Sequence, residues 1–373
     1  MTMPLPEPPR SADLRPGVDA LPPIASDIGR AAVASARDID PGIGAKVAFL
    51  SRPDSYPEPT QRVETIETHM SWVFLTDRHA WKLKKPCRLA RLDLTRLAAR
   101  RGNCEEELRL NRRLSSGVYL DVVPLSLDAS GRLRLAPDGA VVDWLVKMRR
   151  LPAARMLDRR IVAGTATEAD VRAVATRLAR FYAQSAPIAM TGPRYRRIFT
   201  AGIAENERTL AAPAYGLPSA LIADACAWQR DVLARHGADF DRRAQAGRIV
   251  EAHGDLRPEH ICLEAEPQLI DCLEFARELR LLDPVDELAF LALECERLGA
   301  PHFAAPIFAT YAAFTGDAPP APLIAFYRSY RACIRARIAI LHLDDPAPRE
   351  PSKWAANALR YLQLAAAPIG QAG

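Results

Sequence analysis

Features that define several other protein classes are scarce in this sequence. Its 373 residues contain no run that approaches the ~18 consecutive apolar residues of a membrane span. The opening residues, MTMPLPEPPRSADLRPG, lack the basic-then-apolar order of a secretory signal. The seven cysteines form no C-x-x-C pair, which argues against a disulfide framework and against a sulfur-ligated metal. We therefore expect a cytoplasmic protein that does not bind a membrane.

Positive charge is modest, and lysine is rare. The formal net charge is +5, far from the dense basic stripe of a nucleic-acid binder, so we expect no nucleic-acid partner. Only six of the 50 basic residues are lysines. Lys82, Lys84 and Lys85 fall within one four-residue stretch. Because arginine is the usual cation of this chain, the cluster predicts a specific role for at least one of these lysines.

The apolar patterns divide the chain into three segments. Residues 1–45 are rich in Pro, Ala and Asp without a sustained apolar period, so we expect a disordered extension with a short helix near 28–36. Residues 46–150 hold a helical pattern at 94–114 and strand-like runs at 71–76, 80–84, 118–127, 131–136 and 141–148. From 151 to 368 helical patterns dominate, at 168–184, 217–236, 288–298, 323–343 and 354–366. We predict an α+β fold with a small antiparallel-sheet lobe and a larger, mainly helical lobe.

One non-helical segment, residues 249–275, interrupts the helical half, and we call it the island. It holds HGDLRPEH, from His253 to His260, and Asp271, which follows two apolar residues. Phosphoryl transfer needs a carboxylate to orient the acceptor hydroxyl, ligands for Mg²⁺, and cations for the transferred charge. The kinase loop H-R-D-x-x-x-x-N supplies the base and, five residues later, a metal ligand. The spacing therefore predicts Asp255 as the base, with metal ligands at His260 and Asp271.

Two residues of the island modify this prediction. Arg257, two positions after Asp255, would offset charge near the γ-phosphate. His260 stands where the kinase pattern has Asn, and neutral imidazole is a poorer ligand for Mg²⁺ than an oxygen. Three roles stay open for His260: a weak ligand, a ligand for Mn²⁺, or only a hydrogen-bond donor.

The two histidines of the island leave another chemistry open. A metal-dependent hydrolase could hold a transition metal with His253, Asp255, His260 and Asp271. The pattern of the whole segment favours phosphoryl transfer over this alternative.

With these motifs, the sequence resembles the aminoglycoside phosphotransferase family, a branch of the protein-kinase-like fold. The family's loop typically reads HGDLHPGN and is followed by a strand and an Ile-Asp pair, as at 253–260 and 270–271. The run LLDPVDELAFL resembles its D-P-x-x-D-L-A helix start, with Asp283 and Asp286 as structural anchors.

Three further motifs resemble a bacterial subgroup of that family: THMSWVFLTDRHAWKLKKP at 68–86, CEEELRLNRRL at 104–114 and VVDWLVKMRRLP at 141–152. Some members of the subgroup carry a second, P-loop ATPase domain. This sequence has no GxxxxGK[ST] motif, so we expect no such domain in this chain.

The resemblance implies an ATP-dependent phosphotransferase that moves the γ-phosphate to a hydroxyl of a small molecule. Asp255 would be the catalytic base, and Asp271 the principal ligand of Mg²⁺, or of Mn²⁺. A lysine of KLKKP would bind the α- and β-phosphates. The family pattern favours Lys84, with Lys82 as the reserve because alternate residues share one strand face.

The resemblance also implies partners for that lysine and for the nucleotide. Glu107 best fits the helix spacing of the lysine's ion-pair partner. The linker that follows Met148 would present backbone groups to the edge of the adenine.

Departures from the family pattern support an alternative function. No glycine occurs between Ser71 and Leu97, so no Gly-rich loop covers the nucleotide, and Glu259 replaces the usual Gly. Together with His260, these departures favour a kinase-like module that binds a nucleotide or metabolite with little or no catalysis. The basic stretches at 147–160 and 195–197 also disfavour a polycationic acceptor such as an aminoglycoside.

Overall fold

A computed structural model of the chain describes residues 40–89, 92–345 and 350–367. The extension expected at 1–45 and its short helix near 28–36 lie, up to residue 39, outside the described residues. Helix α1 (Gly42–Leu50) begins four residues before position 46, where we expected folded structure to start. Its buried Lys46 donates a hydrogen bond of 2.8 Å to Asp143 in strand β8 (Ala140–Arg149), which connects α1 to the sheet.

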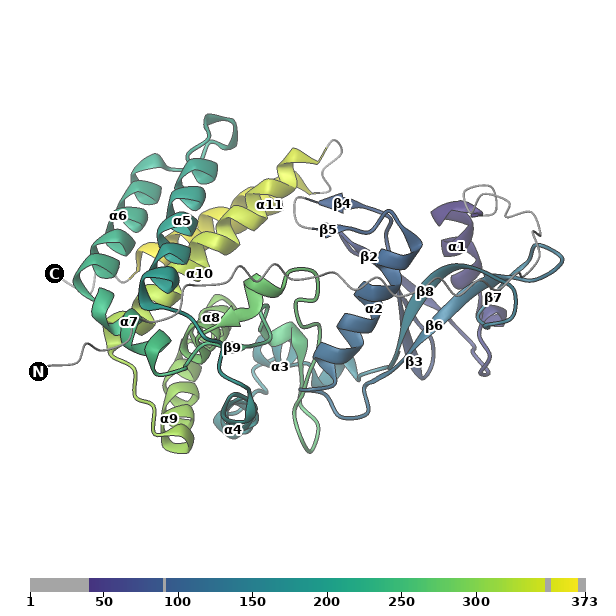
Figure 1. Cartoon of the computed structure of the whole chain (residues 1–373), viewed down its shortest axis with the longest axis horizontal. Helices are drawn as coiled ribbons and strands as arrows, with labels where there is room; N and C mark the ends of the chain where they lie inside the picture. Colours follow the sequence, from purple (N-terminus) through teal and green to yellow (C-terminus); the bar gives the residue numbers. More distant parts are fainter. Residues whose placement is uncertain (1–39, 90–91, 346–349, 368–373) are drawn as a thin grey trace, which may run out of the picture. The chain divides into compact units, whose positions relative to one another are not determined.

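A six-stranded antiparallel sheet in the order β1-β2-β3-β8-β6-β7 forms the smaller lobe (Figure 1). Its strands are β1 (Glu64–Glu67), β2 (Ser71–Leu75), β3 (His79–Lys84), β6 (Tyr119–Leu127), β7 (Leu133–Arg134) and β8 (Ala140–Arg149). The register places Lys82 of β3 opposite Val146 of β8. The structure thus confirms the predicted antiparallel sheet. A separate pair, β4 (Arg88–Leu89) and β5 (Leu92–Asp93), follows β3.

Helix α2 (Leu97–Asn111) lies against β8 and β6. Its buried side chains recur at a spacing of three or four residues: Arg100, Asn103, Cys104, Glu107, Leu110 and Asn111. Residues at this spacing share one face of a helix. The same pattern that makes α2 a surface helix therefore turns Glu107 toward the sheet.

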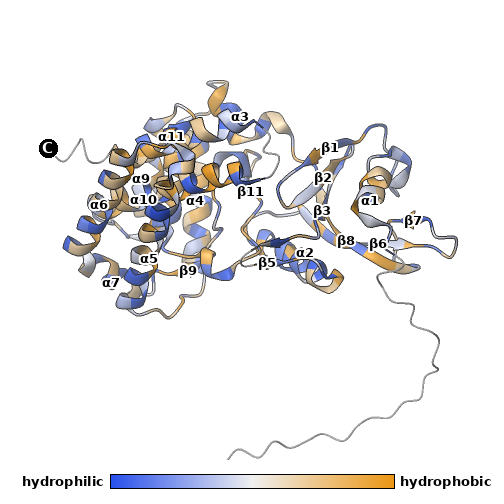
Figure 2. Ribbon diagram, turned by 90° about the horizontal axis from the view of Figure 1, so that it is seen from above, coloured by the Kyte–Doolittle hydropathy of each residue, from blue (hydrophilic) through white to orange (hydrophobic). Residues whose placement is uncertain are grey.

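The larger lobe is helical. Its helices are α3 (Leu157–Val162), α4 (Glu168–Gln184), α5 (Gly192–Leu210), α6 (Ser219–Arg235), α7 (Gly237–Gln245), α8 (Pro284–Arg297), α9 (Ala304–Thr315), α10 (Ala321–Leu341) and α11 (Pro351–Ala366). Hydrophobic and hydrophilic residues alternate around these helices in Figure 2, and the hydrophobic faces form one core. Helix α8 is buried at every position from Pro284 to Cys295. The helical patterns predicted for α4, α6, α8, α10 and α11 are confirmed.

Helices α5 and α9 were not predicted, for different reasons. In α5, Gly192, Pro193 and Gly202 obscure the helical pattern, although Thr191 caps the helix and Pro193 occupies the first turn, where its missing N–H costs little. Helix α9 reads AAPIFATYAAFT, which is apolar almost throughout and therefore shows no periodicity. Among the described residues, no helix combines the length and the apolar character that crossing a membrane requires.

The island forms short strands rather than helices. Strand β9 (Val250–Glu251) pairs with β12 (Leu281–Leu282), and β10 (Ile261–Cys262) pairs with β11 (Gln268–Leu269). The loop between β9 and β10 carries Asp255 and His260, and Asp271 follows β11. The short strands therefore bring both predicted carboxylates to one end of the island.

Candidate active site

Ion pairs join the sheet to the island. Lys82 Nζ donates to Glu107 Oε1 at 2.8 Å and to Asp271 Oδ1 at 2.7 Å. Glu107 is fully buried, whereas the side chains of Lys82 and Asp271 are 14% and 44% exposed. Burial alone would raise the pKa of Asp271, but the Lys82 ammonium and His260 hold it well below its usual range. Asp271 is therefore a carboxylate at neutral pH that faces solvent beside an anchored cation.

Lys84 lies on the same strand face but is enclosed. Its Nζ donates to Glu274 Oε1 at 2.5 Å and also contacts Glu107 Oε2. The side chain has no exposed surface. The geometry therefore favours Lys82, the reserve choice, over Lys84 as the lysine that can meet a phosphate. A sequence signal was present: kinases carry an alanine two residues before this lysine, in V-A-I-K, and Ala80 stands two residues before Lys82.

The turn that carries Asp271 is held by the smaller lobe. Asp271 has a left-handed backbone, with φ of 61°, a conformation that Asp tolerates better than most residues. Its N–H donates to the Tyr119 hydroxyl at 3.1 Å, and the N–H of Cys272 donates to Asn111 Oδ1 at 2.9 Å. Tyr119 belongs to strand β6 of the sheet and Asn111 to helix α2, which packs on it, so the lobe with Lys82 also fixes the backbone of Asp271.

The loop before Asp255 depends on a buried glutamate that the sequence analysis did not single out. Glu287 of α8 accepts hydrogen bonds from the N–H groups of His253, at 3.2 Å, and Gly254, at 2.6 Å. The Tyr182 hydroxyl donates to the same carboxylate at 2.6 Å. Gly254 has a φ of 90°, and a Cβ there would lie 2.9 Å from Leu273 Cβ, so only glycine fits. Glu287 lies in the DELAF run, beside the recognised Asp286.

His253 has a structural position. Its Nδ1 accepts the N–H of Asp255 at 3.3 Å, so Nε2 carries the proton and donates to the carbonyl of Ile270 at 2.8 Å. The residue is fully buried. Because both ring nitrogens are engaged, His253 cannot act as a metal ligand in this arrangement.

Asp255 lies between two arginines. Arg257 Nε donates to its Oδ2 at 3.2 Å, and Arg335 Nη1 of α10 lies 4.0 Å from its Oδ1. Burial would raise the pKa of Asp255, but Arg257, His260 and Arg335 together hold it below its ordinary value. Asp255 is therefore ionised at neutral pH, the state that a base requires. Arg257 also contacts Glu259.

The His260 ring lies between Asp255 and Asp271. Its Nδ1 donates to the backbone carbonyl of Asp255 at 2.8 Å. That bond turns Nε2 toward Arg257 Nη2, at 3.2 Å, and toward Asp271 Oδ2, at 3.5 Å. A hydrogen bond from Arg257 thus occupies the ring nitrogen that would otherwise face a metal.

The residues present fit a magnesium ion held mainly by its substrate. Mg²⁺ is usually bound by one or two carboxylates together with phosphate oxygens and water. Asp271 Oδ2 accepts no hydrogen bond from the described part of the chain, so this oxygen can serve as a ligand. Within the described ranges, no three His, Cys, Asp or Glu side chains form a metal-binding group. The hydrolase site of four protein ligands therefore does not form among these residues.

The end of β8 borders the same site. Met148 is buried in a cluster with Tyr119 and Val146, against which the half-buried side chains of Leu151 and Ile270 pack.

The backbone N–H groups after Met148 differ in their hydrogen bonds. The N–H groups of Arg149 and Arg150 donate to the carbonyls of Val118 and Arg78, both at 2.8 Å. Leu151 N–H, by contrast, donates no hydrogen bond within the described ranges.

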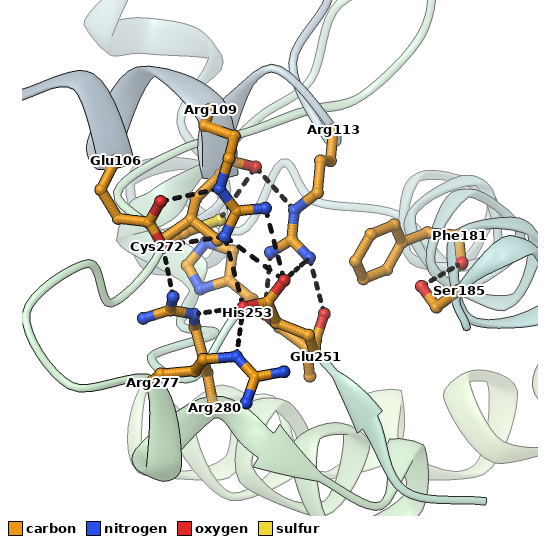
Figure 3. A network of polar contacts seen from close by, with 12 residues as sticks. Glu106, Arg109, Arg113, Phe181, Ser185, Glu251, His253, Cys272, Arg277 and Arg280 are labelled. Atoms are coloured by element: carbon orange, nitrogen blue, oxygen red, sulfur yellow. Dashed lines mark hydrogen bonds and ion pairs between the residues drawn. The ribbon is translucent and has the colours of Figure 1, made fainter. Parts of the chain in front are cut away.

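Arginines also fasten α2 to the strand that leads into the loop (Figure 3). Arg113 donates to the carbonyls of Glu251, at 2.7 Å, and Ala252, at 3.0 Å. The Glu251 carboxylate lies within 3.3 Å of Arg109 and 3.2 Å of Arg280. A hollow of about 430 Å³ beside this network is lined by Arg113, Phe181, Gln184, Glu251 and Arg277, among others. These contacts fix the position of α2, and hence of Glu107, relative to the loop of Asp255.

Comparisons with known proteins were made by sequence and by structure. No protein-family model matches the chain. Uncharacterized proteins of Mycobacterium bovis and Mycobacterium tuberculosis are 33% identical to it over 319 residues, which is 81% of this chain. The chain spans 59% of the length of these curated relatives.

Two solved structures resemble the chain over most of its length. A choline/ethanolamine kinase family protein from Mesorhizobium loti matches with a TM-score of 0.52 and 16% identity, over 86% of this chain and 95% of that one. A choline kinase from Cryptosporidium parvum matches with a TM-score of 0.52 and 9% identity, over 88% and 96%. This likeness confirms the predicted fold: the chain has the bilobal protein-kinase-like fold of small-molecule kinases.

Proposed function

We propose that the chain is an ATP-dependent phosphotransferase that moves the γ-phosphate to a hydroxyl of a small molecule. The observation that carries this proposal is the ion-paired set of Lys82, Glu107 and Asp271, with distances of 2.7 and 2.8 Å, which His260 connects to Asp255. Kinases require such a lysine–glutamate pair, a metal-binding aspartate and a separate catalytic aspartate.

Asp255 is the proposed base. Its lowered pKa keeps the carboxylate ionised at neutral pH, and its side chain is one-quarter exposed, so an acceptor hydroxyl can reach it. The acceptor oxygen forms a bond to the γ-phosphorus while the bond from that phosphorus to the β,γ-bridging oxygen breaks. Asp255 takes the hydroxyl proton, and ADP leaves with the electron pair of the broken bond. Arg257 offsets negative charge beside this carboxylate.

Lys82 and Asp271 are the proposed phosphate-side groups. Lys82 lies between a buried glutamate and a half-exposed aspartate, so its ammonium is held where phosphates would enter. Asp271 Oδ2 would hold Mg²⁺, which neutralises phosphate charge when bound. Lys84 instead neutralises Glu107 from the buried side.

The linker after Met148 is the proposed adenine-binding segment. An adenine ring needs apolar surfaces for its faces and backbone groups for its edge. The half-buried Leu151 and Ile270 supply apolar surface, and the N–H of Leu151 is free of hydrogen bonds to the described residues.

The experiment that tests this function separates binding from chemistry. Calorimetry with ATP and Mg²⁺, or Mn²⁺, should show nucleotide binding, and ADP formation should be measured across a panel of small alcohols. We expect Asp255→Asn to keep the affinity for ATP and to lower turnover about 10²- to 10⁴-fold, the usual contribution of a positioned base. Asp224→Asn, an exposed carboxylate on α6, serves as the matched control and should change neither quantity. Absence of nucleotide binding would refute the proposal.

A second candidate function is a kinase-like module that binds a nucleotide or metabolite with little catalysis. The observation that favours it is the engagement of the catalytic groups with one another, since Arg257 bonds to both Asp255 Oδ2 and His260 Nε2. Nucleotide binding without ADP formation, with any acceptor of the panel, would favour this alternative over the phosphotransferase.

A further inference from the structure

The side of Asp255 that faces away from Arg257 is formed by α10. Asp255 Oδ2 is directed toward Arg257, while Oδ1 faces Arg335 of α10 at 4.0 Å. His260 also lies toward Oδ2 of Asp255, and its far ring nitrogen faces Asp271, so the Oδ1 side is the side on which an acceptor can approach. Arg335 is therefore a cation of the acceptor side.

The Arg335 guanidinium makes no hydrogen bond with the described residues. Its two carboxylate neighbours, Asp255 and Glu294, lie at 4.0 and 3.9 Å, beyond hydrogen-bond distance. Its Nε is buried and has no hydrogen-bond partner among the described residues; Arg337 Nε is similar, but Arg337 has a close ion pair with Glu205, at 2.6 Å. Buried polar groups in native proteins are nearly always hydrogen-bonded, so an exception of this kind requires an explanation.

Glu294 does not provide that explanation, because its carboxylate is already satisfied. The Tyr361 hydroxyl donates to Oε1 at 2.6 Å, and Arg297 Nε donates to Oε2 at 2.7 Å. Arg335 lies over the ring of Tyr361, 5.8 Å from its centroid, which fixes the position of the guanidinium. The residue is thus an oriented cation, 19% exposed, whose donors form no hydrogen bond to the part of the chain that the structure describes.

Arg331, one turn earlier on α10, shows what a structural arginine looks like in this helix. Its Nε and Nη2 donate to the two oxygens of Asp286, both at 2.7 Å. Arg331 thereby makes a two-point ion pair with a buried carboxylate of α8, whereas Arg335 has no such partner among the described residues. Folding accounts for the first arginine and not for the second.

We propose that the acceptor is an alcohol that carries a carboxylate or a phosphate near its reacting hydroxyl, and that Arg335 binds this anion. The inference rests on the proposed function, because it names the acceptor class of the same site. A guanidinium presents paired donors that match the oxygens of a carboxylate or phosphate. It repels a cationic acceptor placed beside Asp255 Oδ1. Arg335 would thus determine specificity, while Asp255 performs the proton transfer.

The test compares acceptors that share a hydroxyl and differ in charge. Glycerol, glycerate and glycerol 3-phosphate form one matched series, choline and ethanolamine supply cationic alcohols, and a wider panel of hydroxy acids and sugar phosphates extends the anionic class. ADP formation is measured with the full chain, ATP and Mg²⁺, for the wild type, Arg335→Gln and Arg337→Gln. Arg337 is the matched control because it lies on the same helix and pairs with Glu205 at 2.6 Å.

We expect an anionic alcohol to stimulate ADP formation, and the carboxylate and phosphate members to show which anion is preferred. Arg335→Gln should lower kcat/KM for that acceptor at least tenfold, with the affinity for ATP unchanged, and Arg337→Gln should stay within twofold of the wild type. Use of neutral or cationic alcohols only would overturn the inference. An equal loss with charged and uncharged acceptors would also overturn it, because Arg335 would then act on the transferred phosphate. Absence of ATP binding, a different result, would refute the proposed function itself.

Discussion

Two groups of ion pairs in this molecule both contain aspartates but differ in how completely the carboxylate oxygens are engaged. In the larger lobe, Arg243 bonds to both oxygens of Asp283 and both oxygens of Asp317, and two tyrosine hydroxyls donate to the same carboxylates. Between the lobes, Lys82 donates to Asp271 Oδ1, whereas Oδ2 accepts no hydrogen bond from the described residues. A saturated, buried group stabilises the fold, whereas an unsaturated oxygen beside an anchored cation is available to a ligand.

The largest effect on stability is expected where the ion pairs are saturated. Arg243→Met would leave Asp283 and Asp317 as buried carboxylates without their cation, which typically costs about 3–5 kcal/mol. The free energy of unfolding should fall by that amount in urea titrations. Under conditions where the variant is folded, its affinity for ATP should match the wild type.

The neighbouring Arg242 provides the control for this prediction. Its side chain is 68% exposed and, within the described ranges, pairs only with the nearby Asp239. An exposed pair of this kind contributes about 0–1 kcal/mol, so Arg242→Met should change the free energy of unfolding by no more than that. Equal losses in the two variants would remove the distinction between saturated and surface ion pairs.

The second prediction separates the two lysines of β3. Lys82→Met should weaken ATP binding about ten- to hundredfold, because a hydrogen bond from a charged group contributes about 1.5–3 kcal/mol. Lys84→Met should instead lower the free energy of unfolding, since Glu107 and Glu274 lose their buried partner. Calorimetry with ATP and urea titration on both variants give the two quantities. The opposite pattern, with nucleotide affinity lost in Lys84→Met alone, would restore the preference drawn from the sequence.

The contrast between these lysines also shows how far the sequence could lead. The fold class and the proximity of Asp255 and Asp271 could be predicted, because motif spacing and short apolar runs are local properties of the chain. The choice between Lys82 and Lys84 could not be made from alternation, which places both on one face. Their burial depends on Glu274 and Asp271, which lie about 190 positions away along the chain.

Residues that act across long sequence separations were missed for the same reason. Glu287 holds the backbone of Gly254 from α8, and Arg335 approaches Asp255 from α10. Nothing in the local pattern of either helix distinguishes these charges from the solvated or structural ones beside them. Only the packing of α8 and α10 against the island brings them to the loop.

The smallest effect is expected from the titration of Asp271 itself. Lys82 and His260 lower its pKa despite burial, so the ionised carboxylate stabilises the folded state fully at pH values above the ordinary Asp pKa of about 3.9, and this contribution fades as the pH falls from that value toward the lower pKa of the folded state. Asp271→Asn preserves the side-chain shape and, like Asp, tolerates a positive φ. Urea titrations should show that the free energy of unfolding of the variant differs from that of the wild type by a constant amount between about pH 5 and 8, above the ordinary Asp pKa. The difference should shrink in more acidic buffer. Because the side chain is 44% exposed, solvent screening keeps the difference small. A difference that grows on acidification would mean that Asp271 is neutral in the folded protein, and the proposed metal ligand would then lack its charge.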